Sequence, residues 1–154
     1  AGDSVGGEVE VKFTGLPVGI GDALFDGLDG HIAHAVFAVP AVKGIAFGRG
    51  FAAASLLGSE NNDPYRMENG RVVTLQNASG GVLGGMSSGM PLLFTAAIKP
   101  TPSIFLPQDS VNLQTNENTV LTVKGRHDPC IVPRAVAPLM AAAALAILDL
   151  WEET

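Results

Sequence analysis

The chain has 154 residues, of which 47% are hydrophobic and 16% are charged, and its formal net charge at pH 7 is −6. This acidic balance argues against nucleic acid as a partner, because phosphate backbones are bound by clustered lysines and arginines. The length suits a single domain over residues 1–154 with a core of its own. The mean hydropathy of +0.31 predicts either a large buried core or an apolar surface that faces something else.

The single cysteine, Cys130, excludes an intrachain disulfide and fits a reducing compartment. No basic segment followed by an apolar one opens the sequence, as it would in a secretory signal. The longest uncharged apolar stretch, residues 135–148, is interrupted by Pro138 and is too short to span a bilayer, so it suits a buried core helix. Together these features predict a cytoplasmic protein with no membrane partner.

The first third of the chain predicts a strand followed by a helix. Residues 5–13 alternate apolar and polar side chains, which is typical of a half-buried strand. A helical pattern then runs from Asp22, the expected N-cap, to about Val39. Gly27 and Gly30 weaken this helix, so we expect it to depend on packing.

The rest of the chain alternates short elements with segments rich in turn residues. The expected elements are a strand over 42–47, a short helix over 51–57, a surface loop over 58–70, a strand over 71–75, a flexible glycine-rich loop over 77–89 able to admit a ligand, a strand over 91–98, a rigid turn over 99–103, a hairpin with strands over 111–113 and 119–123, and a helix over about 133–151. Because strands and helices do not alternate regularly, the predicted fold is α+β, with antiparallel strands packed in layers on helices.

Two segments carry chemically useful side chains. In Lys99–Ser103, two prolines stiffen a turn whose ammonium, hydroxyls and amides would suit a phosphate, although a proline-stiffened strand end with a solvated lysine has the same pattern. Arg126, His127 and Asp128 stand side by side between a glycine and a proline, where an irregular segment could aim two of them into one site. Asp128 beside Arg126 should stay ionised and could accept a proton, and Arg126 could bind a carboxylate or phosphate; the alternative is a salt-bridged turn before a helix.

Other patterns carry weaker signals. His31 and His34 lie three residues apart on the predicted helix and could offer two metal ligands, but a solvated helix face is the favoured interpretation and no metal site is predicted. The glycine-rich loop matches neither a dinucleotide fingerprint nor a P-loop. Cys130 fits a small buried residue better than a nucleophile.

The segment GRHDPCIVPRAV, residues 125–136, resembles the C-terminal signature of the chorismate synthase family. Further strings resemble family motifs in the same order: GDSVGG at 2–7, the segments at 19–28 and 40–51, GSENND at 58–63, the glycine-rich loop at 77–89 and KPTPSI at 99–104. Each string is modest, but the ordered set covers essentially the whole chain.

This resemblance implies an activity, a cofactor and site residues. The implied reaction is the anti-1,4-elimination of phosphate from 5-enolpyruvylshikimate 3-phosphate to give chorismate, with reduced FMN and no net redox change. Asp128 matches the aspartate that accepts a proton near the flavin. The implied FMN contacts are Pro40, Ala41, Gly84, Lys99, Pro100, Thr101, Pro102, Ser103 and Arg126. Pro40 replaces an asparagine found in many relatives, so a backbone contact there would survive the change and a side-chain contact would not.

The family's N-terminal motifs, with their catalytic histidines and several arginines, are absent from this sequence, so the chain resembles the C-terminal portion of a chorismate synthase. It could be an expressed fragment, a proteolytic product or one piece of a split protein. Its expected partners are the missing N-terminal half and further copies, because the family is usually a homotetramer. We expect the isolated chain to be inactive; the alternative is a non-catalytic folded remnant that self-associates through an apolar face.

Overall fold

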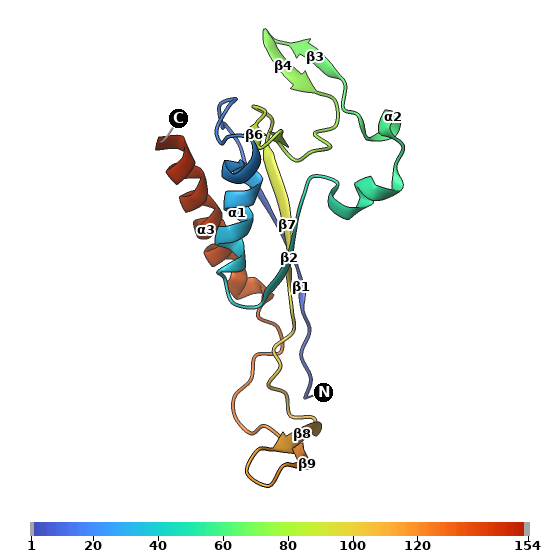
Figure 1. Cartoon of the computed structure of the whole chain (residues 1–154), viewed down its shortest axis with the longest axis vertical. Helices are drawn as coiled ribbons and strands as arrows, with labels where there is room; N and C mark the ends of the chain where they lie inside the picture. Colours follow the sequence, from blue (N-terminus) through green and yellow to red (C-terminus); the bar gives the residue numbers. More distant parts are fainter. Residues whose placement is uncertain (1, 153–154) are drawn as a thin grey trace.

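The computed structural model describes residues 2–152, and its centre is a three-stranded antiparallel sheet in the order β1-β7-β2. These strands are β1 (Gly7–Phe13), β7 (Leu92–Ile98) and β2 (Val42–Phe47). Two helices, α1 (Leu28–Phe37) and α3 (Val132–Glu152), lie side by side over one face of the sheet (Figure 1). The chain therefore has the predicted α+β class, with one helical layer on one antiparallel sheet.

The alternation of side chains along the strands explains why only one face of the sheet is covered. Along β7, alternate residues are buried, and along β1, Val9 and Val11 are buried whereas Glu8 and Glu10 are exposed. A period of two sends alternate side chains to opposite faces, so the apolar set faces the helices. The core formed in this way comprises Val9, Val11, Leu28, Ile32, Val36, Leu92, Phe94, Ala96, Ile98, Leu139, Ala143 and Ile147, among others.

Helix α3 buries one stripe and exposes the rest. Its buried residues, Ala135, Leu139, Ala143, Ile147 and Leu150, recur every three or four positions and face the core. At 21 residues with a mean hydropathy of 1.6, α3 is long and apolar enough to cross a membrane by length and composition, and only 28% of its apolar window is buried. The prediction of a core helix is thus right for one face, and the helix continues through Pro138.

Two hairpins extend away from the core at opposite ends of the molecule (Figure 1). One pairs β3 (Tyr65–Glu68) with β4 (Arg71–Thr74), and the other pairs β8 (Gln108–Asn112) with β9 (Glu117–Leu121). The remaining elements are η1 (Leu24–Asp26), η2 (Gly50–Ser55), α2 (Gly58–Asn61), β5 (Val82–Leu83) and β6 (Met86–Ser87). Every residue of β3 and β9 is exposed, and although Thr74 of β4 is buried, the hydrophobic core includes no residue of either hairpin.

The predicted start of the first helix is wrong. Helix α1 begins at Leu28 with Gly27 as N-cap, and the carboxylate of Asp22 instead accepts a hydrogen bond from the backbone N–H of Ala23. A tertiary contact sets the start of the helix. The N–H of Leu28, which has no partner within the helix, donates to the carbonyl of Gly85 at 2.7 Å.

Two segments expected to be loops contain regular structure. Residues 58–70 include α2 and β3, and residues 77–89 include the β5–β6 hairpin. The glycine-rich segment mainly contacts the protein's own strands: the carbonyls of Gly80 and Gly81 accept hydrogen bonds from Leu93 and Ser88, both at 2.9 Å. The expectation of a flexible loop is therefore wrong where β5 and β6 form, whereas the expected contact of this segment with a ligand stays a prediction.

We predict that Leu139→Ala lowers the free energy of unfolding by about 2–5 kcal/mol, because it leaves a cavity between α3 and the sheet. Leu145→Ala, on the exposed side of the same helix, should change it by less than about 0.5 kcal/mol. Urea denaturation followed by circular dichroism measures both. Equal losses for the two variants would show that the exposed side of α3 is packed as tightly as the buried side.

Candidate functional site

The predicted site residues gather mainly at the end of the sheet where β7 ends. The backbone N–H of Lys99 donates to the carbonyl of Ala41 at 2.9 Å, which places Pro40 and Ala41 beside the start of the proline-rich turn. Ala41 has a φ of 72°, a left-handed conformation that is rare for a residue with a side chain. Such backbone geometry is held by its surroundings and is often found at functional sites.

Residues 2–6 join this turn to the Arg126–Asp128 segment. The hydroxyl of Ser4 donates to the carbonyl of Thr101 at 2.6 Å, and the N–H of Val5 donates to the carbonyl of Pro129 at 2.8 Å. Gly6 permits the close approach, because a Cβ there would clash with the carbonyl of Ile98. The two predicted segments are therefore neighbours, held on either side of one extended strand of backbone.

A cavity of about 250 Å³ opens between these segments. The ring of His127 meets Phe105 edge-on, with 4.9 Å between the ring centroids, and both residues line the cavity. Its lining comprises Gly2, Asp3, Ser4, Ser103, Ile104, Phe105, His127, Asp128 and Pro129. Ser103 and Asp128, which sequence analysis assigned to different segments, thus border the same space.

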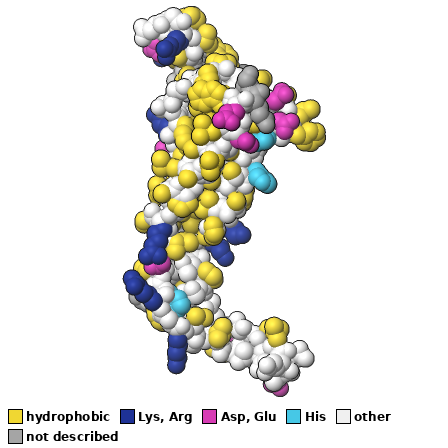
Figure 2. All heavy atoms as spheres, turned by 90° about the vertical axis from the view of Figure 1, so that its left-hand side faces the viewer, with side chains coloured by type: hydrophobic (Ala, Val, Ile, Leu, Met, Phe, Trp, Pro, Cys, Tyr) yellow, Lys and Arg dark blue, Asp and Glu magenta, His cyan; other side chains and the backbone are white. Residues whose placement is uncertain are grey.

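The charged groups here differ from the predicted arrangement. Asp128 pairs with Arg134, with 2.6 Å between Oδ2 and Nη1, and not with Arg126 as its sequence neighbour suggested. The side chains of Arg126 and Lys99 are exposed, and neither makes a hydrogen bond or ion pair to another residue within 2–152. Figure 2 shows that many of the Lys and Arg side chains visible on that face lie in its lower half. Neither Lys99 nor Arg126 lines the cavity, but an unpaired cation can bind an anion, and both belong to the two segments that border it.

Two buried polar atoms at this end have no partner. The Thr101 hydroxyl and the His127 Nε2 make no hydrogen bond among the described residues. An unsatisfied buried polar atom is costly, so such atoms often mark the place of a missing ligand or water. Together with the free cations, they make the chemistry of this end compatible with FMN, which has both a phosphate and hydroxyl groups. Sequence analysis named His127 in the candidate segment without giving it a role, and it missed Phe105, because the contact between the two rings has no local signal.

Gly84 lies apart from the other predicted contacts. It is in the turn between β5 and β6, next to the start of β7, whereas Lys99 follows the end of β7 (Figure 1). Seven residues of strand separate the two by about 20 Å. A side chain at Gly84 would meet nothing within 4 Å, so its backbone is open to contact. One copy of the chain does not bring Gly84 and Lys99 into one site.

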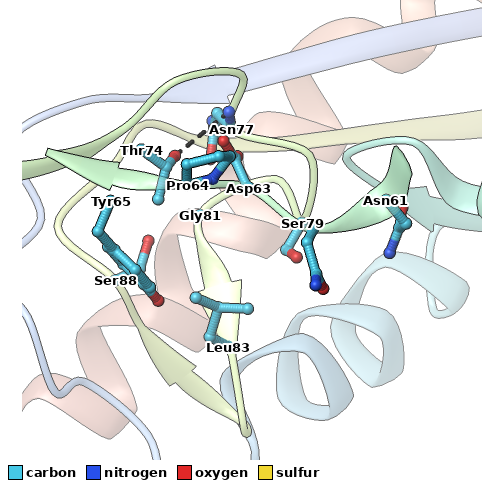
Figure 3. Close-up of a pocket in the computed structure, with 11 residues that line it drawn as sticks. Asn61, Asp63, Pro64, Tyr65, Thr74, Asn77, Ser79, Gly81, Leu83 and Ser88 are labelled. Atoms are coloured by element: carbon cyan, nitrogen blue, oxygen red, sulfur yellow. Dashed lines mark hydrogen bonds between the residues drawn. The ribbon is translucent and has the colours of Figure 1, made fainter. Parts of the chain in front are cut away.

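A larger pocket, of about 570 Å³, lies between the base of the β3–β4 hairpin and β5 (Figure 3). Most of its lining residues are of polar types, and Figure 3 shows the side chains of Tyr65, Ser88 and Leu83 on one side of it. Its lining comprises Asn61, Asn62, Asp63, Pro64, Tyr65, Thr74, Asn77, Ser79, Gly81, Leu83 and Ser88. None of these residues was predicted individually as a site residue, but five of them belong to the glycine-rich segment 77–89 that was expected to admit a ligand: Asn77, Ser79, Gly81, Leu83 and Ser88.

Asp63 closes the base of the β3–β4 hairpin. Its carboxylate accepts hydrogen bonds from the backbone N–H groups of Gln76 at 2.8 Å and Ala78 at 2.7 Å. Burial acts to raise the pKa of Asp63, but hydrogen bonds from Ala78, Gln76, the Thr74 hydroxyl and Leu75 outweigh burial and hold the pKa below the ordinary value of 3.8. Arg49 adds a second link at this base, because its guanidinium donates to the side chain of Gln76 and, at 2.8 Å, to the carbonyl of Glu60.

The histidine pair on α1 borders a separate shallow pocket of about 480 Å³ against α3. His31 lies 3.6 Å from the carboxylate of Asp26, and His34 lines the same pocket. Within residues 2–152, no three His, Cys, Asp or Glu side chains stand close enough to hold a metal ion. Cys130 is a half-buried free thiol.

A family model described as chorismate synthase matches residues 1–151. A chorismate synthase of Dehalococcoides mccartyi is 54% identical over 149 residues, which cover 97% of this chain and 41% of that protein. One of Methanosarcina barkeri is 51% identical over 148 residues, which cover 96% and 40%. The chain belongs to the chorismate synthase family, as the resemblance indicated, and it spans about two fifths of the length of these relatives.

The solved structures include one titled as the crystal structure of chorismate synthase that has the same fold. It superposes on this chain with a TM-score of 0.78 at 29% sequence identity, and the match covers 99% of this chain and 38% of that one. The predicted fold class and family are therefore confirmed. The family is one of lyases, and its members belong to the shikimate pathway.

We predict that Asp63→Asn lowers the stability of the hairpin base at neutral pH. The folded-state pKa of Asp63 is depressed, so its carboxylate stabilises the fold above the unfolded pKa, and this contribution is lost as the pH falls through the folded pKa. Hydrogen exchange of the Gln76 and Ala78 amides should be faster in the variant at pH 7, and urea unfolding should show a gap to the original chain that narrows below about pH 4. Asp109→Asn on the exposed side of β8 is the control. An unchanged exchange rate at both amides would contradict the assignment.

Proposed function

We propose that this chain is the cofactor-binding part of a chorismate synthase that eliminates phosphate from 5-enolpyruvylshikimate 3-phosphate, with reduced FMN, to give chorismate. The observation that carries the proposal is the meeting of the Lys99–Ser103 turn and the Arg126–Asp128 segment around one cavity. Membership of the family supplies the reaction, and the free cations and unsatisfied polar atoms support an anionic, hydroxyl-bearing ligand. On this basis the chain forms one folded unit that corresponds to the C-terminal part of the family's sequence.

The cofactor would be held by groups of three kinds. Lys99 and Arg126 supply positive charge for its phosphate or another electron-rich edge, and the stiff turn of Pro100, Thr101, Pro102 and Ser103 supplies hydroxyl and backbone groups. Pro40 and Ala41 would contact it through the backbone, which suits the proline at position 40. Reduced FMN supplies electron density while phosphate leaves, and this chemistry belongs to the cofactor.

Asp128 is the proposed proton acceptor. Its ion pair with Arg134 holds the carboxylate at the edge of the cavity, and a carboxylate in that position can accept a proton from a bound ligand. The substrate's other contacts would come from the parts of the enzyme beyond this chain, including a basic clamp. The complete enzyme is proposed to be a cytoplasmic homo-oligomer, in line with the biosynthetic role of the family.

The alternative function is a non-catalytic folded module. The exposed apolar side of α3, with Val136, Met140, Leu145 and Leu148 accessible, favours association with another protein surface. The two functions differ in one result: supplying the remaining family sequence as a separate chain restores activity only if this chain is a working part of the enzyme.

We predict that the isolated 154-residue chain binds FMN weakly and has no turnover, because it spans only about two fifths of its relatives. Flavin fluorescence titration measures the binding, and chorismate formation measures the turnover. Addition of the remaining segment of a close relative should tighten binding and produce activity. Tight binding and turnover by the isolated chain would refute the proposal that the rest of the enzyme supplies part of the site.

We predict that Arg126→Gln and Asp128→Asn have different effects in the reconstituted enzyme. Loss of a charged hydrogen bond at Arg126 should weaken FMN binding by roughly tenfold or more. Asp128→Asn should leave binding nearly unchanged and lower kcat by about 10²- to 10⁴-fold, as expected for the loss of an acid–base group. Arg66→Gln on the β3–β4 hairpin is the control for a general loss of positive charge. Weaker FMN binding in Asp128→Asn with unchanged kcat would exclude Asp128 as the proton acceptor.

A further inference from the structure

The carboxylate of Asp128 has two arginines near it in sequence, and it pairs with only one of them. Its Oδ2 lies 2.6 Å from Nη1 of Arg134, in the first turn of α3. Arg126 is two positions from Asp128, yet it makes no hydrogen bond or ion pair to a residue within 2–152. The long, flexible stem of an arginine lets its guanidinium reach a carboxylate at that separation. The pairing with Arg134 therefore decides which arginine remains free.

The backbone beneath each partner of this ion pair is fixed. The N–H of Arg134 donates to the carbonyl of Ile131 at 3.0 Å, at the start of a helix that packs on the core. On the other side, the carbonyl of Pro129, next to Asp128, accepts a hydrogen bond from the N–H of Val5 at 2.8 Å. Only the two side chains have to be ordered when the pair forms, so it costs less entropy than a pair between two mobile loops.

Arg126 lies in a segment without regular structure, between the end of β9 and the start of α3. Its side chain is exposed, and Gly125 before it has a φ of 148°, a conformation that favours glycine. A guanidinium on such a segment adjusts easily to a ligand. It folds as easily onto a carboxylate that has no partner of its own.

The two carboxylates that line the neighbouring cavity both have partners. Asp3 accepts a hydrogen bond from the N–H of Ser4 at 2.8 Å, and Asp128 is paired with Arg134. Removal of the Arg134 guanidinium would leave Asp128 unpaired, two residues from an unpaired Arg126, and opposite charges that close attract each other. Arg126 thus stays available to an anion because Arg134 occupies the carboxylate nearest to it in sequence.

We propose that Arg134 is a positioning residue of the candidate site, which keeps Arg126 free for an anionic ligand by pairing with Asp128. This role rests on the proposed function, because it explains how the groups assigned to FMN binding and to proton transfer are kept apart. The side chain of Arg134 is 71% exposed and is not among those that line the cavity, so it acts through Asp128. An exposed ion pair adds little to stability, and its effect here is on the choice of partner.

The first test needs neither cofactor nor substrate. Guanidinium protons exchange with water more slowly in a paired arginine than in a free one, and NMR of the 154-residue chain measures this exchange. We expect slow exchange at Arg134 and fast exchange at Arg126. In Arg134→Gln, exchange at Arg126 should slow by about two- to fivefold, the range expected for one exposed ion pair. In Arg134→Gln combined with Asp128→Asn, it should be fast again.

The matched control is Arg66→Gln, which removes a positive charge and breaks the exposed ion pair with Glu68. It should leave the exchange at Arg126 unchanged. Unchanged exchange at Arg126 in Arg134→Gln would overturn the proposal. Slow exchange that persists after Asp128→Asn is added would overturn it too, since the carboxylate bound by Arg126 would then belong to another residue.

The second test follows FMN binding in the reconstituted enzyme by flavin fluorescence. Arg134→Gln should weaken binding by about two- to fivefold, and Arg134→Lys should keep most of the affinity, because an ammonium also pairs with Asp128. Asp128→Asn should leave binding nearly unchanged when Arg134 is present and should restore it when Arg134→Gln is present. Structural damage at position 134 would not be repaired by a second substitution at position 128.

The two tests separate this role from the proposed function. If Arg126→Gln does not weaken FMN binding, the proposed function fails, and the NMR measurement still decides whether Arg134 keeps Arg126 free. If Arg126→Gln weakens binding but Arg134→Gln does not, the positioning role is wrong and the proposed function stands. The same holds if Arg134→Gln weakens binding as much with Asp128→Asn as without it.

Discussion

The candidate site depends on how residues 4–6 pass between the Lys99–Ser103 turn and Pro129. Ser4 binds the carbonyl of Thr101 on one side, and Val5 binds the carbonyl of Pro129 on the other, so two segments about 25 residues apart in sequence share one strand of backbone as their support. This passage requires Gly6, because any Cβ there would meet the end of β7. The extended backbone continues into β1, whose register on β7 is fixed over seven residue pairs, so the site is tied directly to the most regular part of the core.

The exposed side of helix α3 also bears on function. Helix α3 buries one stripe against α1 and the sheet, yet its other side carries accessible Val136, Met140, Leu145 and Leu148. A helix that is apolar on both sides is normally enclosed on both sides. Since the chain spans about two fifths of its relatives, the rest of the enzyme is the cover that we propose for this face. The high apolar content noted from composition therefore has a specific location, which is the outer side of one layer.

The sequence predicted the elements whose signal is local and failed where a tertiary contact decides. Strands β1 and β7 and helix α3 follow from side-chain periods of two and 3.6, and the structure contains all three. The start of α1 was misplaced because Asp22 looks like a cap, whereas the carbonyl of Gly85, 57 residues away, sets the first turn. The role of Asp63 could not be predicted, because its donors lie 13 and 15 residues further along the chain. Arg134, not the adjacent Arg126, pairs with Asp128 for a similar reason: the first turn of α3 brings it back over the segment.

The two ends of the sheet have different chemistry. The predicted FMN contacts are divided between them, because Gly84 lies at one end and Lys99 and Arg126 lie at the other. Free cations, unsatisfied polar atoms and a carboxylate lie at the end where β7 stops, whereas a pocket lined by Leu16, Val18 and Met86, among others, lies where it starts. Gly84 belongs to the second end, although its motif implies a cofactor contact like those of Lys99 and Arg126. A strand of seven residues holds these groups about 20 Å apart in one copy. The FMN contacts that the family motifs imply are therefore divided between the two ends of β7, so they do not form one continuous surface within residues 2–152.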